Sequence, residues 1–469
     1  LSAAKRAAKL GAKVGLADFV NPSPSGTKWG LGGTCVNVGC IPKKMMHFAS
    51  LLGEARHDQK SSGWEVNTSS KHNWKAMVSS VGTHIKRLNW SYKKKLIEEG
   101  VKYFNAYARF REPHTLVLTN KKGKETVVSV DKVIVATGGR PTYLNLPNVR
   151  ELAITSDDIF WRKSPPGKTL IIGAGYIAVE CAGFIRGMGH EVDILVRSTV
   201  LKKFDRDMIR RVVRDMEQRG IHLMRGGMRK LEKEQGRVSV TYEIEKNADL
   251  IDGGILEEQI AQQETRKVEY DTVLLAIGRT PETAKIGLDA IGLLKNQDGK
   301  VPVDDVYQTN IDNVHIIGDI REDSPELTPV AIKEGLYVAD CLFGDRPAKA
   351  INYDAIPTTI YSPLEYASLG LSEENAILQY GEENLEVYHK SFKPLEWNFF
   401  EAHLNDLCYT KVIVNKSDEE TVLGIHYAGP NAGEVMQGFA LALLRRTTFA
   451  ELKEIGKRAI KILFSFFSF

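Results

Sequence analysis

The stretch that decides the fold is KTLIIGAGYIAVECAGFIRGMGHEVDILVR, residues 168–197. A short apolar run at 169–172 predicts a strand, and a turn through Gly173 and Gly175 follows it. A segment with the apolar spacing of a helix comes next, and a second apolar strand ends at Arg197. Strand, glycine turn, helix and strand in this order predict a dinucleotide-binding βαβ unit.

The glycines of this turn indicate a phosphate group beside the backbone. Without side chains, the turn lets a pyrophosphate approach the helix N-terminus, where unpaired N–H groups and the helix dipole favour negative charge. The third glycine of the pattern is replaced by Ala178, which the pattern tolerates. We expect Gly173, Gly175 and Ala178 to hold the dinucleotide, and a structural crossover without a ligand is the alternative.

The end of the second strand predicts which nucleotide binds. An NAD site would place Asp or Glu there to bind the ribose hydroxyls. This strand ends instead at Arg197, and Lys202 and Lys203 follow. Cations suit a 2′-phosphate, so the sequence predicts NADPH, with a lysine binding that phosphate as a point charge and less specifically than arginine would.

The first residues predict a second nucleotide unit. The stretch LSAAKRAAKLGAKVGLADF reads as a helix rich in Ala, Lys and Arg, followed after Gly11 by a strand at about 13–16. Asp18 then stands where a carboxylate holds an unphosphorylated ribose. We expect the first strand and the glycine loop of this unit to precede Leu1. Two dinucleotide sites of different charge fit FAD and NADPH.

Three further segments support two nucleotide domains. The stretches KVIVATGGRP, 132–141, and TVLLAIGRTP, 272–281, are apolar strands that run into Gly-Arg turns, where the chain could cross between domains. The stretch NVHIIGDI, 313–320, ends its strand with Asp319, whose carboxylate could accept a hydrogen bond from a ribityl hydroxyl. The polar stretch 246–267 is expected to be a solvated hairpin insertion.

The stretch WGLGGTCVNVGCIPKK, 29–44, holds two cysteines separated by four residues, Cys35 and Cys40. A zinc site would need four ligands, and only His47 stands nearby, so no metal is predicted. A crosslink that closes so short a loop would stabilise little, because the entropy removed grows with loop size. If a helix begins at Pro42, its dipole lowers the pKa of the Cys40 thiol. Spacing alone leaves a structural and a redox disulfide open, and a neighbouring flavin favours the redox one.

Composition excludes several classes of protein. The chain has 469 residues with a net charge of +4, 43% hydrophobic and 26% charged residues, which describes an ordinary globular protein of about three domains. No basic tract interleaved with aromatic residues predicts nucleic-acid binding, and no apolar run approaches the roughly 18 residues of a membrane span. Five cysteines are ordinary for a reducing compartment.

The stretch GGTCVNVGCIPKK resembles the active site of the flavin-dependent pyridine nucleotide–disulfide oxidoreductases, the family of glutathione reductase, lipoamide dehydrogenase and high-molecular-weight thioredoxin reductase. The stretches WGLGGTCVNVGC, HNWKAM, LNWSY, TSDDIF, PLEYASLGLSEE and FKPLEW resemble the animal-type thioredoxin reductases and thioredoxin–glutathione reductases within it. Similarity covers about residues 1–456. It implies NADPH-dependent reduction of thioredoxin or a similar protein disulfide, in cell redox homeostasis and in the cytoplasm, with mitochondria as the alternative. Reduction of glutathione disulfide is the alternative activity.

The resemblance also implies roles for individual residues. Cys40 would be the charge-transfer thiolate against the flavin, and Cys35 the interchange thiol that attacks the substrate disulfide. Lys43 would lie near flavin N5, paired with Glu180, and Tyr176 would cover the flavin until nicotinamide displaces it. FAD would be held by Asp18, Gly33, Thr34, Thr137, Gly138, Asp319 and Thr328, and NADPH by Gly173, Gly175, Ala178, Arg197, Lys202 and Gly278.

The implied architecture is an α/β fold of glutathione-reductase type, in which two Rossmann-like domains precede an α+β dimerisation domain. The stretch 410–444 reads there as a hairpin and then a helix that is capped near Pro430 and Asn431. The apolar face of this helix suits a homodimer interface, and a core helix is the alternative. The expected domains are FAD-binding at 1–139 and 271–345, NADPH-binding at 140–270, and dimerisation at 346–469.

Both ends of the sequence depart from the family pattern. The FAD-binding glycine loop would precede Leu1, and after FAELKEIG the chain continues KRAIKILFSFFSF where the family has a histidine and a glutamate that assist proton transfer, and then a redox-active tail. The tail after about residue 456 is therefore atypical. From these departures we expect little thioredoxin reduction by this chain, and a catalytically impaired fragment without FAD is a further alternative.

Overall fold

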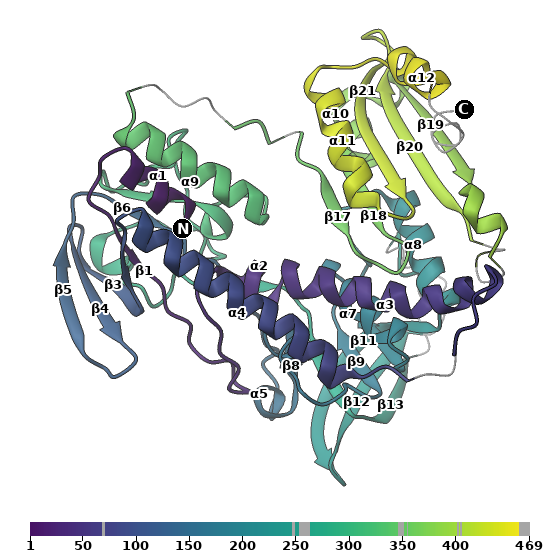
Figure 1. Cartoon of the computed structure of the whole chain (residues 1–469), viewed down its shortest axis with the longest axis horizontal. Coiled ribbons are helices and arrows are strands. Elements are labelled where there is room, and N and C mark those ends of the chain that lie inside the picture. Colours follow the sequence, from purple (N-terminus) through teal and green to yellow (C-terminus); the bar gives the residue numbers. More distant parts are fainter. Residues whose placement is uncertain are drawn as a thin grey trace.

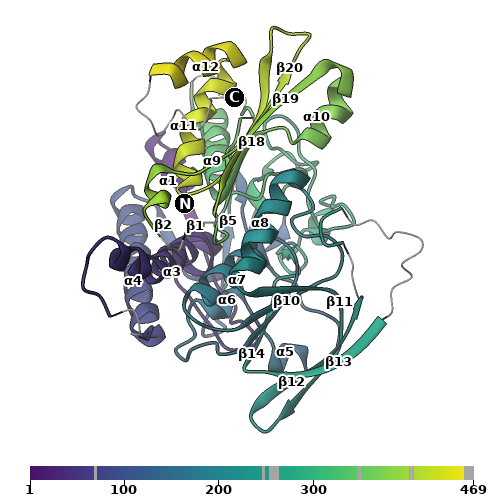
Figure 2. The ribbon, with the colours of Figure 1, turned by 90° about the vertical axis from the view of Figure 1, so that its right-hand side faces the viewer.

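The structure is a computed structural model that describes residues 1–67, 71–245, 249–252, 263–345, 351–353, 355–400, 403 and 406–458. The described chain forms three parts, each built around β-strands, and long helices run between them (Figure 1). The view turned by 90° shows the C-terminal part above the largest sheet (Figure 2). The fold is the mixed α/β architecture that the sequence predicts.

The first part is assembled from both halves of the sequence. Strand β6 pairs in parallel with β16, which follows it by about 180 residues, and α1 packs against α9. Strand β1 pairs in parallel with β2 and begins at Gly15, two residues later than predicted. The elements are α1 (Ser2–Lys9), β1 (Gly15–Ala17), α2 (Gly33–Val38), α3 (Cys40–Ser61), α4 (Trp74–Glu98), β2 (Lys102–Phe104), the meander β3 (Ala106–Glu112), β4 (Thr115–Asn120) and β5 (Glu125–Ser129), then β6 (Val133–Val135), β16 (Val314–Ile316) and α9 (Thr328–Phe343).

The chain leaves this part and returns to it at one place. Strand β7 (Gly139–Pro141) pairs antiparallel with β15 (Arg279–Pro281), so the outgoing and incoming segments are hydrogen-bonded to each other. Gly139 permits the approach, since a Cβ there would lie 3.1 Å from the Thr280 carbonyl oxygen. The two Gly-Arg turns therefore lie together, as a crossing between domains requires, while the boundaries drawn at 139/140 and 270/271 stay a prediction.

The middle part is a seven-stranded sheet in the order β13-β12-β11-β10-β9-β14-β8. Its centre is β9 (Thr169–Ile172), which coincides with the predicted strand, is buried along its whole length and pairs in parallel with β10 and β14. The remaining elements are α5 (Val149–Leu152), β8 (Ile154–Thr155), α6 (Ser156–Ile159), α7 (Tyr176–Gly187), β10 (Val192–Val196), α8 (Arg206–Gln218), β11 (Ile221–Glu234), β12 (Arg237–Glu245), β13 (Gln263–Tyr270) and β14 (Thr272–Leu275).

The predicted hairpin at 246–267 overlaps a strand at its end. Residues 263–267 belong to β13, which pairs antiparallel with β12 along the edge of the sheet. The side chains of β13 alternate between exposed and half-buried, as in an edge strand, and composition alone does not distinguish such a strand from a loop. Much of the remaining stretch lies outside the described residues.

The C-terminal part is a five-stranded antiparallel sheet, β17-β18-β21-β20-β19, with helices against it. The predicted hairpin is present as β20 and β21, paired from Tyr409 to Asn415. The elements are β17 (Thr358–Ile360), β18 (Tyr366–Gly370), α10 (Glu373–Tyr380), β19 (Leu385–Phe392), β20 (Cys408–Asn415), β21 (Thr421–Ala428), α11 (Ala432–Leu444) and α12 (Phe449–Arg458).

The predicted helix after the hairpin begins in the expected place but is capped differently. Asn431 stands at the N-cap with φ of 54° and its side chain accepts no capping hydrogen bond. The Ala432 amide instead donates to Glu365 Oε2 at 2.9 Å, and the other oxygen of Glu365 bonds His47 Nε2 at 2.9 Å. The buried carboxylate of Glu365, the residue before β18, therefore takes the place of the local cap and links α11 to α3.

A buried ion pair joins the middle and C-terminal parts. Lys411 on β20 is 2% exposed, and its ammonium lies 2.9 Å from the carboxylate of Asp205, the N-cap residue of α8. Glu373 of α10 also pairs with Lys411. Because separating these charges would leave one of them buried and unpaired, the network fixes how the two parts dock.

In the described ranges, no helix has both the length and the apolar composition to cross a membrane. The atypical tail predicted after residue 456 lies almost entirely outside the described residues, as does the start of the predicted dimerisation domain at 346.

Candidate redox and nucleotide sites

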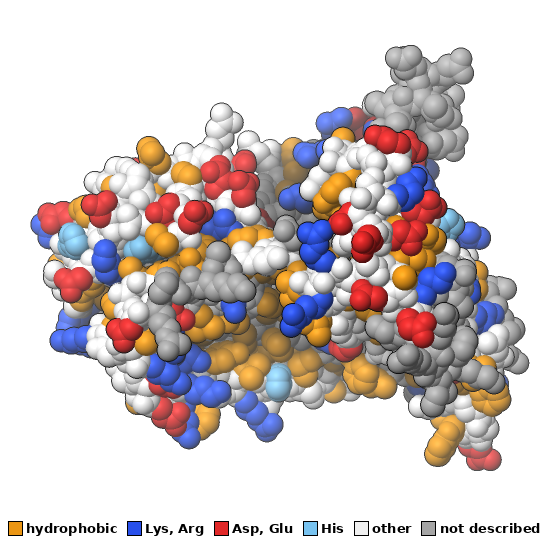
Figure 3. All heavy atoms as spheres, turned by 90° about the horizontal axis from the view of Figure 1, so that it is seen from above, with side chains coloured by type: hydrophobic (Ala, Val, Ile, Leu, Met, Phe, Trp, Pro, Cys, Tyr) orange, Lys and Arg blue, Asp and Glu red, His pale blue; other side chains and the backbone are white. Residues whose placement is uncertain are grey.

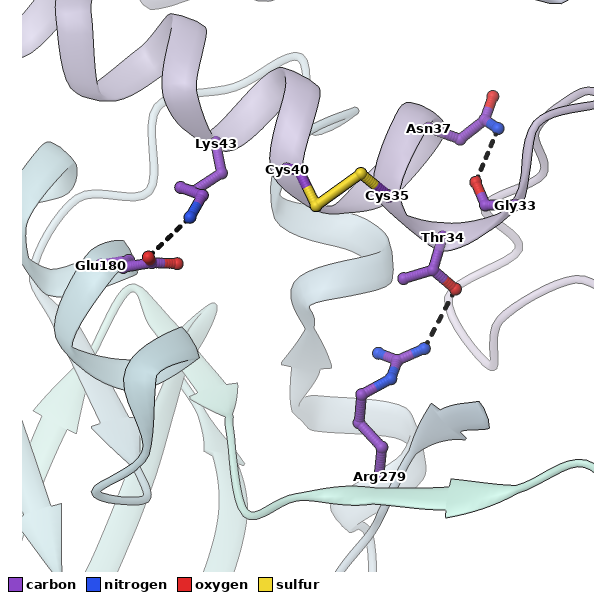
Figure 4. Close-up of a disulfide and its surroundings, with 8 residues drawn as sticks. All are labelled: Gly33, Thr34, Cys35, Asn37, Cys40, Lys43, Glu180 and Arg279. Carbon is purple, nitrogen blue, oxygen red and sulfur yellow. Dashed lines mark hydrogen bonds and ion pairs between the residues drawn. A yellow bond between two sulfur atoms is a disulfide. The ribbon is translucent and has the colours of Figure 1, made fainter. Parts of the chain in front are cut away.

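Cys35 and Cys40 form a disulfide, with 4.6 Å between their Cα atoms. Cys35 lies in α2, and Cys40 is the first residue of α3, two residues before the predicted start of that helix (Figure 4). The helix N-terminus favours negative charge, which suits a thiolate at Cys40 once the disulfide is reduced. Cys40 is exposed and Cys35 half-buried, so exposure alone does not assign the interchange role to Cys35.

Asn37, between the two cysteines, holds the disulfide loop in place. Its side-chain amide donates to the Gly33 carbonyl at 2.8 Å, and Asn89 of α4 donates to its Oδ1 at 2.9 Å. Trp161 Nε1 donates to its carbonyl at 2.9 Å. Asn37 is fully buried, so these bonds replace water that it cannot reach. Asn37 was not predicted from the sequence, where the only signal is a polar side chain in an apolar run.

Lys43 and Glu180 form the ion pair that the resemblance implies. Helix α3 packs against α7, and Lys43 Nζ lies 2.6 Å from Glu180 Oε1 (Figure 4). Their side chains are 13% and 4% exposed, which makes the pair a largely buried one. The same oxygen accepts the Tyr361 amide at 3.1 Å. The contact is confirmed, and the role of Lys43 beside a flavin stays a prediction.

Arg279 links the domain crossing to the redox loop. Its guanidinium donates to Thr34 Oγ1, next to Cys35, at 3.2 Å (Figure 4). It also donates to the Gly139 carbonyl. Arg279 stands in the turn GRTP, and no role for it was predicted from the sequence. The fold brings it to Thr34 across 245 residues of sequence, a separation that no local pattern spans.

The β9–α7 turn has the geometry that a dinucleotide phosphate needs. Gly173 has φ of +135°, and a Cβ there would overlap the Ala276 carbonyl oxygen. A Cβ on Gly175 would meet no described atom within 4 Å, so the backbone there is open to a ligand. Ala178 is fully buried against the sheet, and Tyr176, the first residue of α7, is 42% exposed. Unpaired N–H groups at this helix start suit a pyrophosphate.

The predicted 2′-phosphate residues lie at the same edge. Arg197 is exposed and follows β10, the parallel neighbour of β9. The Leu201 amide donates to the Ala174 carbonyl at 2.8 Å, which places Lys202 beside the glycine turn. Lys202 and Lys203 are exposed, and Gly278, with φ of +111°, follows β14 on the other side of β9. These residues fit an anionic nucleotide.

The predicted FAD carboxylates are available for ligand hydroxyls. Asp18 follows β1 and Asp319 follows β16, and burial raises the pKa of each carboxyl above its usual range. Among the described residues none donates a hydrogen bond to either carboxylate, so hydroxyl donors of a ligand would satisfy them. The chemistry of these positions fits the ribose and ribityl chain of FAD.

A buried carboxylate shapes the turn that carries Asp319. The Gly318 amide donates to Glu334 Oε2 at 2.6 Å, and Arg321 Nε donates to its other oxygen at 3.1 Å. A Cβ on Gly318 would lie 3.1 Å from Ala331 in the first turn of α9, the turn that begins with Thr328. The turn that carries Asp319 therefore packs against the first turn of α9, and binding of FAD by Thr328 and Asp319 stays a prediction.

Two other predicted FAD positions are open and one is already bonded. Gly33 and Gly138 have φ of +74° and +67°, and a Cβ on either would meet no described atom within 4 Å. The Thr137 hydroxyl donates to the Glu282 carbonyl at 2.8 Å, so in this structure it fastens the domain crossing. That Thr137 also holds FAD stays a prediction.

No metal centre emerges from the described part of the chain, since no three His, Cys, Asp or Glu side chains gather there as a metal ion would need.

Viewed from above, the surface is hollowed between the two sides of the molecule, and apolar side chains gather in the hollow (Figure 3).

Comparison with known proteins agrees with this geometry. Residues 1–335 match the sequence profile of pyridine nucleotide-disulphide oxidoreductases, and residues 356–455 match their dimerisation domain. The chain is 46% identical over 465 residues to Thioredoxin reductase SEP1 of Emiliania huxleyi, a similarity that covers 97% of this chain and 90% of that relative.

Proposed function

The chain belongs to the pyridine nucleotide-disulphide oxidoreductase family, and from this premise we propose that it is an NADPH-dependent flavoenzyme that reduces the disulfide of thioredoxin. The observation that carries the proposal is the Cys35–Cys40 disulfide at the start of α3, one turn from the buried Lys43–Glu180 pair. Its cofactors are FAD and NADPH, and its dimerisation domain makes it a homodimer.

The two cysteines can exchange a disulfide with a protein substrate in two steps. Bound FAD supplies a group that accepts two electrons from nicotinamide. After the Cys35–Cys40 bond has taken up two electrons, the Cys35 thiolate attacks one sulfur of the substrate disulfide and forms a mixed disulfide. Cys40 then attacks the Cys35 sulfur, which releases the substrate as a dithiol and restores the bond. The Asn37 hydrogen bonds hold the loop in place through both steps.

The cytoplasm is the compartment we propose, with mitochondria as the alternative. Support comes from the cysteines. Of the five in the chain, Cys35 and Cys40 form the disulfide, and the other three, Cys181, Cys341 and Cys408, are free thiols. Free thiols beside one redox-active disulfide suit a reducing compartment. A fluorescent fusion of the full chain that collected only in an oxidising compartment would contradict the proposal.

The function is tested by following NADPH oxidation with two disulfide substrates. Protein supplied with FAD should be yellow and should oxidise NADPH in proportion to oxidised thioredoxin, and at least tenfold faster than with glutathione disulfide at equal concentration. Faster turnover of glutathione disulfide would favour the alternative substrate. A colourless protein without turnover would support the impaired fragment instead, and so would a yellow one that reduces neither.

Arg197→Ala should weaken NADPH binding by about 1.5–3 kcal/mol, the free energy of a lost charge-assisted hydrogen bond, and leave NADH binding almost unchanged. The reason is that the exposed Arg197 follows β10 where a 2′-phosphate would lie. Fluorescence titration of both nucleotides measures the effect. The control is Arg214→Ala, which removes an exposed arginine of α8, a helix that packs against the same sheet. Equal losses for both nucleotides would show that Arg197 does not read the 2′-phosphate.

A further inference from the structure

Tyr361, directly after β17 of the C-terminal part, lies over the first turn of α3. Lys43 Nζ is 4.4 Å from the centroid of its ring, and Lys44 Nζ is 5.2 Å from the same centroid. The Tyr361 amide donates to Glu180 Oε1 at 3.1 Å, the oxygen that also binds Lys43. One residue of the C-terminal part therefore touches both members of the buried ion pair.

Close packing on two sides fixes Tyr361 in this position. A Cβ on Gly183 of α7 would lie 3.0 Å from the ring of Pro363, so the segment after β17 rests directly on α7. A Cβ on Gly433 in the first turn of α11 would lie 3.0 Å from the Tyr361 hydroxyl. The ring of His47 approaches from α3, with 5.5 Å between ring centroids. Tyr361 and the segment that follows it are therefore packed among three helices, α3, α7 and α11.

The two lysines beneath the ring have different partners. Lys43 binds the buried Glu180, whereas Lys44 pairs with Glu434 at the exposed start of α11. The aromatic face attracts an ammonium through the ring quadrupole, and more strongly where water is excluded, as at Lys43. A lysine has four rotatable side-chain bonds, so a second contact on its ammonium greatly narrows the positions that it can take.

We propose that Tyr361 is a positioning residue of the redox site, which holds the Lys43 ammonium against Glu180 through its ring face while its amide fixes the Glu180 carboxylate. The C-terminal part thereby contributes a residue to the redox site of its own subunit. The amide contact survives any side-chain change at position 361, so the ring can be tested alone. The inference rests on the proposed function only for the importance of Lys43 to the cofactor.

The ring's effect on Lys43 is measurable without turnover. Acetylation of Lys43 by acetic anhydride in the folded protein can be followed by peptide mass spectrometry. In Tyr361→Leu it should become roughly three- to tenfold faster, which corresponds to the strength of a partly buried cation–π contact. Tyr361→Phe keeps the ring and should leave the rate unchanged. A flavin-loaded Tyr361→Leu protein should also show a more negative midpoint potential than Tyr361→Phe, because the cation beside the flavin is less well held.

Tyr409→Leu is the matched control. Tyr409 lies in the same five-stranded sheet and also makes a cation–π contact, with Arg211 on α8, far in sequence from the redox loop. Its loss should leave Lys43 acetylation at the wild-type rate. The proposal is overturned if Lys43 reacts no faster in Tyr361→Leu, if Tyr361→Phe accelerates it equally, or if Tyr409→Leu does so. If the acetylation results are as expected but the protein reduces no thioredoxin, only the proposed function fails.

Discussion

Cys40→Ser should abolish reduction of thioredoxin, with turnover falling roughly 10⁴-fold or more, as expected when the reacting group itself is removed. The disulfide with Cys35 cannot form, so the protein has no dithiol from which two electrons can pass to the disulfide of its substrate. Cys35→Ser should reduce turnover equally. Stopped-flow and steady-state NADPH oxidation measure both variants, and Cys341→Ser, a free half-buried cysteine, should stay within about twofold of wild type.

The two serine variants should differ in their spectra. On anaerobic reduction by NADPH, Cys35→Ser should keep a long-wavelength absorbance of thiolate beside flavin, because Cys40 remains at the start of α3. Cys40→Ser should lack it. If both variants keep the band, the assignment of the charge-transfer role to Cys40 is wrong, and if only Cys40→Ser keeps it, the roles of the two sulfurs are reversed.

Lys43→Met should lower the free energy of unfolding by about 3–5 kcal/mol, because it leaves the 4% exposed Glu180 side chain without its cation. The Tyr361 amide still donates to Glu180 but carries no full charge. Urea unfolding followed by circular dichroism at fixed protein concentration measures the loss.

The neighbouring lysine supplies the control for this prediction. Lys44 pairs with Glu434 through side chains that are 50% and 55% exposed, so Lys44→Met should change the free energy of unfolding by less than about 1 kcal/mol. Lys43→Met combined with Glu180→Leu removes both buried charges and should recover much of the loss. Equal effects of Lys43→Met and Lys44→Met would show that burial does not set the strength of the pair.

The features that were predictable from residue patterns alone depend on a few consecutive residues. Strand β9 coincides with the predicted strand at residues 169–172. Four consecutive apolar residues before a glycine turn are too few for a helix and favour a buried strand. The Cys35–Cys40 disulfide follows from close spacing and the quoted motif. The Lys43–Glu180 pair spans 137 residues and could be named only through the family resemblance.

The features that the sequence did not reveal depend on contacts between distant segments. Arg279, Asn37 and Tyr361 act through partners that the fold brings from other helices and strands. The cap of α11 shows the same limit, since Asn431 satisfies the local rule while the buried Glu365 takes the bond. Packing overrides the local preference there, because a buried carboxylate must find donors.

The pairing of β7 with β15 has a consequence for how such a chain can change over evolution. Because the segments that leave and rejoin the first part are adjacent, the residues between them form an inserted domain, here called a cassette, whose two ends lie next to each other. A cassette of this kind can be exchanged for another at little cost in loop-closure entropy, since the host chain need not bridge a gap. The buried Asp205–Lys411 contact sets the condition for such a graft, which must bring a carboxylate to the same place on the C-terminal sheet.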